Sequence, residues 1–596
     1  MATLDELVQR LGERFGVLAE SSTDQLTVIA RNTDVAIGDL FLLPCKRGPD
    51  RFYVFRTTEY ANVLNRTLEM NDVARNKLTM PDSYFAEDLA DEKLVELRGM
   101  VLGYAQYAAG AWSFFRPRRL PQHLTDVYHV DPGNRAVGTV VRELMRSQLG
   151  EEGLFVGNLL AGERALVDVP VYLPPHALSH HLGVFGRTGC GKSNLMMVLL
   201  GSVLDHNRAV LRRERAGPAL SVFAIDPHDE FRAWHAPVGG ADGLRAVVAG
   251  YSDAERSALV APFYYLTARD LPGAGLERRV QLSRADVTPA DLVSIMEFSE
   301  QQIAFANQYY GDHGETWIGR LLSGELTGRR VEEEVPEYLP GTVAAVQRRL
   351  GFLTLGSTRV FTRFDPEMGL DYVSDLPDIV CALESGRVIV VDTTLMGELE
   401  QFLLNTVVAR TLFTLRRALR SADTPGRLEI EIRQGLGNED AQGQVGLRSF
   451  AEALLDRLSD GRLPYQEGDR IRSPDELPYV NIVVEEAPSV LNPLRMRFGS
   501  VFRDISRQGR KFGIGLTVVS QQVTEIDHGV LSQLNTQLTM ALGNADERRE
   551  AVRGAAADLG GFGQELQVLG RGQTLLTTSF RDVALPVQVP EYGAYD

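Results

Sequence analysis

A glycine-rich run between two apolar segments carries the residue types that bind nucleotide phosphates. Gly186, Gly189 and Gly191 lie in the order Gly-Arg-Thr-Gly-Cys-Gly-Lys-Ser, after the strand-like segment Leu182–Phe185 and before a helix-like segment from Asn194. Such glycines let backbone N–H groups turn inward around a polyphosphate, and the helix offers its positive N-terminal end to the same anion. The pattern predicts a phosphate-binding loop. A chance glycine turn before Lys-Ser is disfavoured, because the strand, loop and helix are all in place.

Two side chains at the end of this run predict ATP and Mg²⁺ chemistry. Lys192 would reach the β- and γ-phosphates, and the Ser193 hydroxyl would ligate Mg²⁺. The residues expected to bind the nucleotide are Gly186, Thr188, Gly189, Cys190, Gly191, Lys192, Ser193 and Asn194.

Acidic residues follow two further apolar runs. Asp226 comes after Ser221–Ile225, and Glu485 and Glu486 come after Tyr479–Val484. Ligands of open α/β sheets bind at the carboxyl ends of the strands, so we expect Glu485 to bind Mg²⁺ and Glu486 to act as general base. Both roles require the chain to leave the sheet there, because consecutive strand residues face opposite ways. The alternatives are a charged loop at Asp226 and paired acids at a surface turn.

A basic segment from Arg503 to Lys511 leads into the apolar run Ile514–Val519 and then Gln521. A guanidinium there could stabilise charge on the γ-phosphate across a subunit boundary, and Gln521 could sense the γ-phosphate. Arg503 and Arg507 are four residues apart on one helix face, so a solvated or Asp-paired surface explains them equally well.

The composition predicts a multidomain protein of a reducing cytoplasm. A chain of 596 residues exceeds a single core, and the wide spacing of Cys45, Cys190 and Cys381 offers neither a disulfide framework nor a metal site. We expect no signal peptide and no membrane span, because the first residues are charged and no long apolar run occurs. The net charge of −17 excludes a DNA-coating protein but not a motor that encloses DNA.

The N-terminal part predicts a small β-barrel. Short β-rich runs at residues 25–30, 38–43, 51–57 and 94–103 alternate with turn-forming residues. A polar stretch at residues 72–93 is typical of a helix. The basic cluster Arg116-Pro117-Arg118-Arg119 is explained most simply as a solvated barrel rim.

From about His180 onward, strands and helices alternate, which predicts an α/β fold with a mostly parallel sheet. Residues 236–384 are expected to form a helical insertion, in which Thr288-Pro289 starts a helix. Another helix is expected at residues 398–420 and a loop at residues 433–446, and residues 574–579 predict a final strand. The expected buried strands are residues 182–185, 221–225, 388–391, 480–484, 514–519 and 538–542.

These motifs in this order resemble HerA, a family of hexameric DNA translocases of the FtsK–HerA group. The matching segments are His181–Asn194, Asp226-Pro227-His228, Glu485-Glu486-Ala487, Arg507–Gly513 and Ser520-Gln521-Gln522. The resemblance implies an N-terminal HerA-type barrel at residues 1–175, a RecA-like ATPase core at 176–235 and 385–575, the insertion at 236–384 and a C-terminal strand and tail at 576–596. It also implies a homo-hexamer on double-stranded DNA, partnered by a NurA-type nuclease in end resection and recombinational repair.

The same resemblance assigns roles to individual residues. Asp226 and Glu486 match the catalytic acids, Arg510 the trans-acting arginine finger and Gln521 the sensor. Three residues depart from the family pattern: Cys190 in the loop, His180 before the strand, and Pro488 after the two glutamates. The thiol at Cys190 raises the hypothesis that the motor is sensitive to oxidation.

We therefore expect an ATP-driven DNA translocase or helicase. The alternatives are an FtsK-type or conjugation-type DNA pump, a small-molecule kinase, and an inactive scaffold. An ordinary charged surface explains each candidate DNA contact equally well, and these candidates are Arg329, Arg330, Arg348, Arg349, Arg495 and Arg497.

Overall fold

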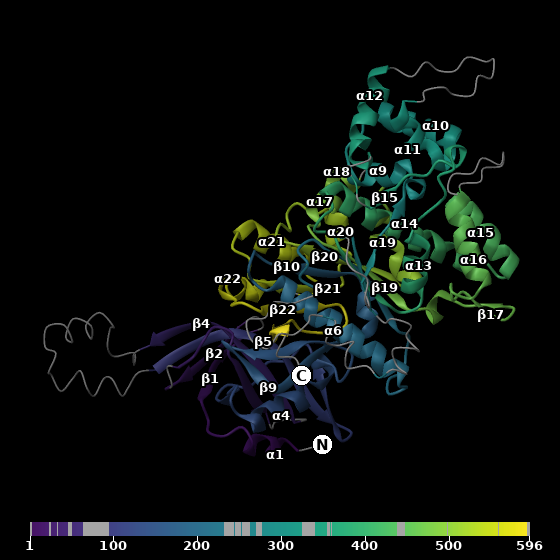
Figure 1. Ribbon diagram of the computed structural model, residues 1–596. Helices are drawn as coiled ribbons and strands as arrows, with labels where there is room; N and C mark the ends of the chain where they lie inside the picture. Colours follow the sequence, from purple (N-terminus) through teal and green to yellow (C-terminus); the bar gives the residue numbers. More distant parts are fainter. Residues whose placement is uncertain are drawn as a thin grey trace. The chain divides into compact units, whose positions relative to one another are not determined.

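The computed structural model describes residues 3–22, 25–31, 34–45, 50–63, 94–231, 244, 252, 263–269, 277–324, 340–354, 358, 360–437, 448–496, 499–557 and 559–592. Two compact units make up the chain (Figure 1). The barrel unit comprises Met1–Pro174, Phe185–Leu195 and Asn535–Glu591. The sheet unit comprises Pro175–Val184, Met196–Leu534 and Tyr592–Asp596. The helix expected at residues 72–93 lies outside the described residues.

An antiparallel barrel forms the N-terminal part of the barrel unit. Its strands follow the order β2-β1-β7-β3-β4-β5, and pairing of β2 with β5 closes it, while β6 extends the sheet beyond β5. Alternating inward side chains, such as Leu26 and Val28 in β2, fill its interior. The expected barrel is confirmed. The strands are β1 (Gly16–Ser21), β2 (Leu26–Ala30), β3 (Leu40–Cys45), β4 (Arg51–Val63), β5 (Leu94–Ala108), β6 (Ala111–Phe115) and β7 (Asp126–His129).

A second set of antiparallel strands lies in the same unit, with the order β21-β22-β23-β8-β9. Its C-terminal part confirms strands close to residues 538–542 and 574–579. β8, β9 and β23 were not expected, and β23 shows that the strand at residues 574–579 is not the final one. The elements here are α1 (Leu4–Gln9), α4 (Arg135–Leu144), α5 (Arg146–Leu149), β8 (Leu154–Ala161), β9 (Arg164–Leu173), β21 (Thr536–Met540), α21 (Ala545–Gly554), α22 (Glu565–Val568), β22 (Gln573–Thr578) and β23 (Leu585–Gln588).

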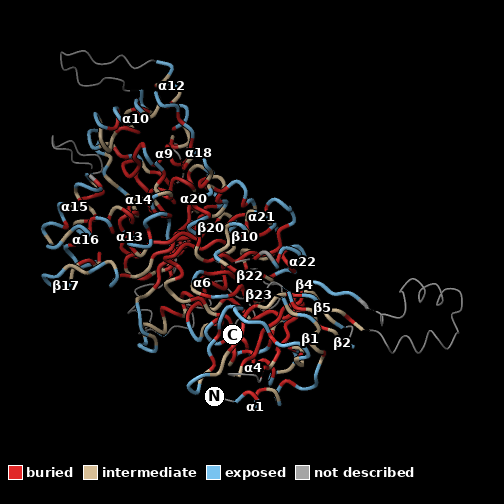
Figure 2. Tube along the Cα trace, turned by 180° about the vertical axis from the view of Figure 1, so that it is seen from behind, coloured by how far each residue is buried: buried red, intermediate tan, exposed pale blue. Residues whose placement is uncertain are grey.

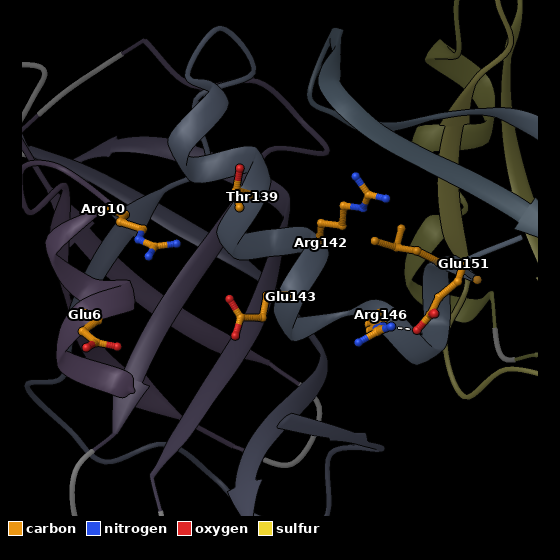
Figure 3. Close-up of a pocket in the computed structure, with 9 residues that line it drawn as sticks. Glu6, Arg10, Thr139, Arg142, Glu143, Arg146 and Glu151 are labelled. Atoms are coloured by element: carbon orange, nitrogen blue, oxygen red, sulfur yellow. Dashed lines mark hydrogen bonds and ion pairs between the residues drawn. The ribbon is translucent and has the colours of Figure 1, made fainter. Parts of the chain in front are cut away.

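The sheet unit contains the parallel sheet, in the order β13-β12-β16-β11-β19-β20-β10. The pairings of β12 with β13, β12 with β16, β11 with β16, β11 with β19 and β19 with β20 are all parallel. Its central strands are buried along their length, as Figure 2 shows around β20, which explains their continuous apolar runs. The strands are β10 (Leu182–Phe185), β11 (Leu220–Asp226), β12 (Phe263–Thr267), β13 (Glu277–Arg279), β16 (Val388–Asp392), β19 (Tyr479–Val484) and β20 (Ile514–Ser520).

The segment expected as a helical insertion also contains sheet strands. β12 and β13 fall within residues 236–384, and β12 pairs with β16. The helix start at Thr288-Pro289 is confirmed, but the helix ends at Ile295 and Ser299 caps a new one. The elements here are α9 (Pro289–Ile295), α10 (Glu300–His313), α11 (Trp317–Ser323), α12 (Pro340–Arg349), α13 (Leu376–Glu384), β14 (Leu282–Ser283) and β15 (Phe361–Thr362).

The loop expected at residues 433–446 is wrong at its start, because a helix continues to Gly437. Leu428, Ile432 and Leu436 are buried at four-residue spacing, which gives this helix an apolar face. Residues 438–447 lie outside the described residues. The remaining main elements are α14 (Glu398–Ser421), α15 (Pro425–Gly437), α16 (Arg448–Ser459), β17 (Gln466–Glu467), β18 (Arg470–Ile471), α17 (Pro488–Leu491), α18 (Pro493–Met496), α19 (Val501–Gln508) and α20 (His528–Leu531).

A short 3₁₀ segment, η1 (Pro175–His180), packs directly on the backbone of β20. A Cβ added to Gly515 would lie 1.8 Å from the carbonyl oxygen of Leu178. The same carbonyl accepts a hydrogen bond of 2.8 Å from the Asn481 side chain in β19. The close approach therefore requires glycine at this position of the sheet.

We predict that Gly515→Ala lowers the free energy of unfolding by about 1–3 kcal/mol, the usual cost of forcing an extra methyl group into a packed site. Gly311→Ala is the matched control, because a Cβ at that helical glycine meets no atom within 4 Å. Thermal unfolding followed by circular dichroism measures both. An unchanged melting temperature for Gly515→Ala would contradict the packing described here.

Candidate functional site

The glycine-rich run forms a tight loop between β10 and α6 (Lys192–Leu211). Gly189 and Gly191 adopt φ angles of +76° and +109°, a backbone region that favours glycine. The Lys192 ammonium donates hydrogen bonds to the carbonyl oxygens of Gly186 at 2.8 Å and Arg187 at 3.2 Å. The lysine therefore lies folded over the loop, beside the N-terminus of a long helix, and this arrangement fits a polyphosphate.

Neighbouring strand ends in the barrel unit support the loop. The Arg187 amide donates to the carbonyl of Ala541 at 2.9 Å, and the Gly572 amide donates to the carbonyl of Cys190 at 2.8 Å. The Asn194 side chain, expected at the nucleotide, donates to the carbonyl of Pro590 at 2.8 Å. Asn194 thus ties the first turn of α6 to the segment after β23.

The carboxyl ends of the parallel strands carry a row of polar residues. Asp226 at the end of β11 pairs in register with Asp392 at the end of β16, which pairs in turn with Thr267 at the end of β12. Phe223 of β11 pairs with Ile482 of β19, so Asp226 is level with the residue three positions beyond Ile482, which is Glu485. The register therefore brings the acidic residues predicted from two separate motifs to one edge of the sheet.

Asp226 is buried at this edge and engaged by the backbone. Its two carboxylate oxygens accept hydrogen bonds of 2.9 Å from the amides of Glu230 and Phe231. Burial, with smaller contributions from the neighbouring carboxylates Asp229 and Asp392, raises its pKa to about 6. Asp226 therefore stabilises the turn after β11 through these two hydrogen bonds, in addition to any chemical role.

Several residues of this cluster were missed by the sequence analysis. Arg269 bridges Asp392 at 2.9 Å and Asp229 at 3.3 Å, and the Tyr265 hydroxyl donates to Asp229. Thr267 donates to Asp392 at 2.7 Å. A signal existed, because Asp392 ends an apolar run as Asp226 does. The partners Tyr265, Thr267 and Arg269 could not be found without the strand pairing.

Glu485 and Glu486 follow β19 where the chain leaves the sheet. Glu486 is exposed and adopts a φ of +48°, and the Ala487 amide donates to the carbonyl of Val519 at 3.2 Å. The two glutamates therefore lie in a turn and not within the strand. Pro488 begins α17 at its first position, where proline costs no hydrogen bond.

The arginine segment lies at the other edge of the parallel sheet. Arg507 ends α19, and Arg510 lies in η7 (Gly509–Phe512), which directly precedes the amino end of β20. Both side chains are exposed, whereas Arg503 donates to the carbonyl of Met496 at 3.0 Å. Gln521, in contrast, follows the carboxyl end of β20. The structure therefore places Gln521 at the edge of Asp226 and Glu485, and Arg510 at the opposite edge.

Two histidines accompany Arg510 at that edge. The ring centroids of His176 and His180 lie 5.4 Å apart. Nδ1 of His180 is hydrogen-bonded to the carbonyl oxygen of His176 at 2.8 Å. Burial lowers the pKa of both histidines, and the positive charge of Arg510 lowers them further. His180, where the family more often has a basic residue, is therefore biased toward its neutral form.

Cys190 is buried below the loop, where its thiol lies 3.7 Å from the Met540 sulfur. Burial raises the pKa of this thiol. Both features oppose formation of the reactive thiolate, so the geometry disfavours the oxidation sensitivity that the sequence suggested.

Strand, glycine-rich loop and helix, together with acids at the carboxyl ends of a parallel sheet, define a nucleotide-binding protein of the P-loop class. Comparison with known proteins narrows the class. Residues 154–408 match the family model described as "Helicase HerA, central domain", so the HerA resemblance is confirmed.

Two curated archaeal proteins are similar over most of the chain. The DNA double-strand break repair helicase HerA of Pyrococcus furiosus is 22% identical over 76% of this chain and 71% of its own length. A probable HerA of Methanocaldococcus jannaschii is 22% identical over 75% of this chain and 78% of its own length.

Solved structures are more distant. The coupling protein TrwB bound to an ATP analogue is 11% identical over 75% of this chain and 91% of its own, with a TM-score of 0.42. VirB4 of Thermoanaerobacter pseudethanolicus is 12% identical over 74% of this chain and 97% of its own, with a TM-score of 0.37. Within the described residues, no helix is long and apolar enough to cross a membrane.

We predict that thiol-directed alkylation of Cys190 in the folded protein is slow, because the thiol is buried and its pKa is raised. Mass spectrometry after timed iodoacetamide treatment measures the modified fraction, with the urea-unfolded protein as the reference. Equal rates in the folded and unfolded states would contradict the buried position. Cys190→Ser should show the same sensitivity of activity to alkylation as the wild type.

Proposed function

We propose that this chain is an ATP-driven translocase or helicase of double-stranded DNA. It acts as a homo-hexameric ring with a NurA-type nuclease in DNA end resection and recombinational repair. The observation that carries the proposal is the complete phosphate-binding loop within a span that matches the HerA central domain. The proposed division of the chain keeps a barrel at residues 1–175, an ATPase core at 176–235 and 385–575, an insertion at 236–384 and a C-terminal segment at 576–596.

Each residue of the site has a proposed task. Lys192 would hold the β- and γ-phosphates. Ser193 and Glu485 are the proposed ligands of Mg²⁺, which would stabilise negative charge on the phosphate oxygens. Glu486 accepts the proton of the attacking water, and its exposed position beyond the strand supports that task. Two further residues of this edge take part: Asp226 polarises the water and orders the turn after β11, and Gln521 senses the γ-phosphate.

The arginine finger is proposed to act on the neighbouring subunit. Arg510 is exposed and lies at the amino edge of the sheet, whereas the acids lie at the carboxyl edge. Because one protomer keeps these groups at opposite edges, Arg510 suits a site on the adjoining protomer better than its own. Arg507, exposed on the last turn of α19, is the second candidate.

The DNA contacts are proposed to be mainly electrostatic, with affinity that falls steeply as salt rises. Of the candidate arginines, Arg348 and Arg349 are both exposed, whereas Arg495 is half-buried. Arg348 donates to the carbonyl of Ala344 at 3.3 Å, and Arg349 stacks on the Phe298 ring at 5.2 Å. The two exposed arginines are therefore better placed than Arg495 to meet a phosphate. Arg329, Arg330 and Arg497 lie outside the described residues.

We predict ATP hydrolysis that linear duplex DNA stimulates and that Lys192→Ala abolishes, because the ammonium no longer neutralises the phosphates. Glu486→Gln should bind ATP but turn it over at least about a hundredfold more slowly, since proton transfer contributes about 10²–10⁴-fold. Phosphate release with and without DNA measures turnover. A wild-type protein without turnover, or with turnover indifferent to DNA, would overturn the proposal.

We predict that Arg510→Ala lowers kcat by about a thousandfold, as loss of an arginine finger does, while native mass spectrometry still shows the ring. Mixing Arg510→Ala with Lys192→Ala protomers should restore part of the turnover. Some interfaces then combine an intact lysine with the neighbour's intact arginine. Mixed rings as inactive as either parent would argue against a shared site.

A further inference from the structure

The short connection between α22 and β22 lies directly against the phosphate-binding loop. It comprises residues 569–572 of the barrel unit. The Gly572 amide donates to the Cys190 carbonyl at 2.8 Å, and a Cβ added to Gly191 would lie 3.3 Å from the Gly572 nitrogen. The backbone of this connection is therefore in van der Waals contact with the backbone of the loop.

The segment is held in one conformation by its neighbours. Gly572 adopts a φ of +73°, and a Cβ there would lie 2.9 Å from the Gln588 side chain. Its carbonyl accepts from the Val589 amide at 2.8 Å. The Gly570 amide donates to the Gln573 side chain at 2.8 Å. These contacts leave little freedom to a residue between the two glycines.

That residue is Arg571, whose side chain is exposed. Among the described residues, Arg571 has no ion pair and no hydrogen bond of its side chain. Arg548 of the same unit differs, because its guanidinium donates to the carbonyls of Leu542 at 2.9 Å and Gly543 at 2.8 Å. Arg571 is thus an exposed cation with no ion pair among the described residues, and the next residue, Gly572, contacts the loop.

We infer that Arg571 binds the phosphate chain of a nucleotide in the loop of its own protomer. A guanidinium suits this task, because its planar donors match phosphate oxygens in pairs and its charge persists at all physiological pH. Arg571 would approach from the side of β22 and β23, where Asn194 is tied to Pro590. The inference rests on the proposed nucleotide binding and adds a cation in cis to the proposed arginine in trans.

Equilibrium titration with a fluorescent ATP analogue, displaced by ATP, ADP or inorganic tripolyphosphate, tests the inference. Arg571→Ala should weaken all three competitors about tenfold or more, as loss of a charge-assisted hydrogen bond does. Arg571→Lys should restore part of the affinity. Arg553→Ala, an exposed arginine on α21, is the matched control and should stay within twofold of the wild type. In steady-state assays, KM for ATP should rise more than kcat falls.

The outcomes separate the inference from the proposed function. If the wild type binds ATP, Lys192→Ala loses binding and Arg571→Ala matches the wild type, the inference is wrong and the function stands. If tripolyphosphate affinity is unchanged while ATP affinity falls, Arg571 contacts the base or ribose and the phosphate assignment is wrong. If the wild type binds no nucleotide, both fail. An unchanged melting temperature of the ligand-free Arg571→Ala variant excludes misfolding.

Discussion

The parallel register of the buried strands is the constraint on which the acidic site depends. β12, β16, β11 and β19 are covered on both faces, so polar side chains are tolerated chiefly where the strands end. The register then determines which strand ends are adjacent. It aligns Thr267, Asp392 and Asp226, and Glu485 is level with Asp226 when residues are counted along β11 and β19. Residues more than two hundred positions apart thus share one edge. A slip of one residue between strands would turn each acid toward the opposite face.

Clustered carboxylates at this edge carry an electrostatic cost that their neighbours offset. Arg269 bridges Asp229 and Asp392, and two backbone amides serve Asp226. The pKa of Asp226 nevertheless rises to about 6, first through burial and then through the adjacent acids. Burial is therefore the main influence on the protonation of Asp226, and the neighbouring carboxylates add to it.

Local sequence patterns predicted the elements whose structure depends on residues close together in the sequence. The phosphate-binding loop, its strand and helix, and the buried strands around Asp226 and Glu485 are short contiguous signals. What the sequence did not predict depends on long-range pairing. β12 joins the sheet through β16, and only that pairing reveals Thr267 and Arg269 as partners of Asp392. The sequence analysis missed the helix that continues to Gly437, because its apolar face consists of three residues separated by polar residues and glycine.

Several buried hydrogen bonds stabilise the amino edge of the sheet, where Arg510 lies. Arg416, fully buried, pairs with Glu384 at 2.9 Å and donates to the carbonyl of Pro478 at 2.9 Å, just before β19. It also reaches the carbonyl of Phe512 at 3.5 Å, at the end of η7. His181, kept neutral by burial that lowers its pKa to about 4, accepts from the Leu516 amide. These bonds hold η7 against the sheet. Arg510 therefore extends from a segment that buried hydrogen bonds fix at the amino edge, and the proposed role in trans requires no movement of that segment.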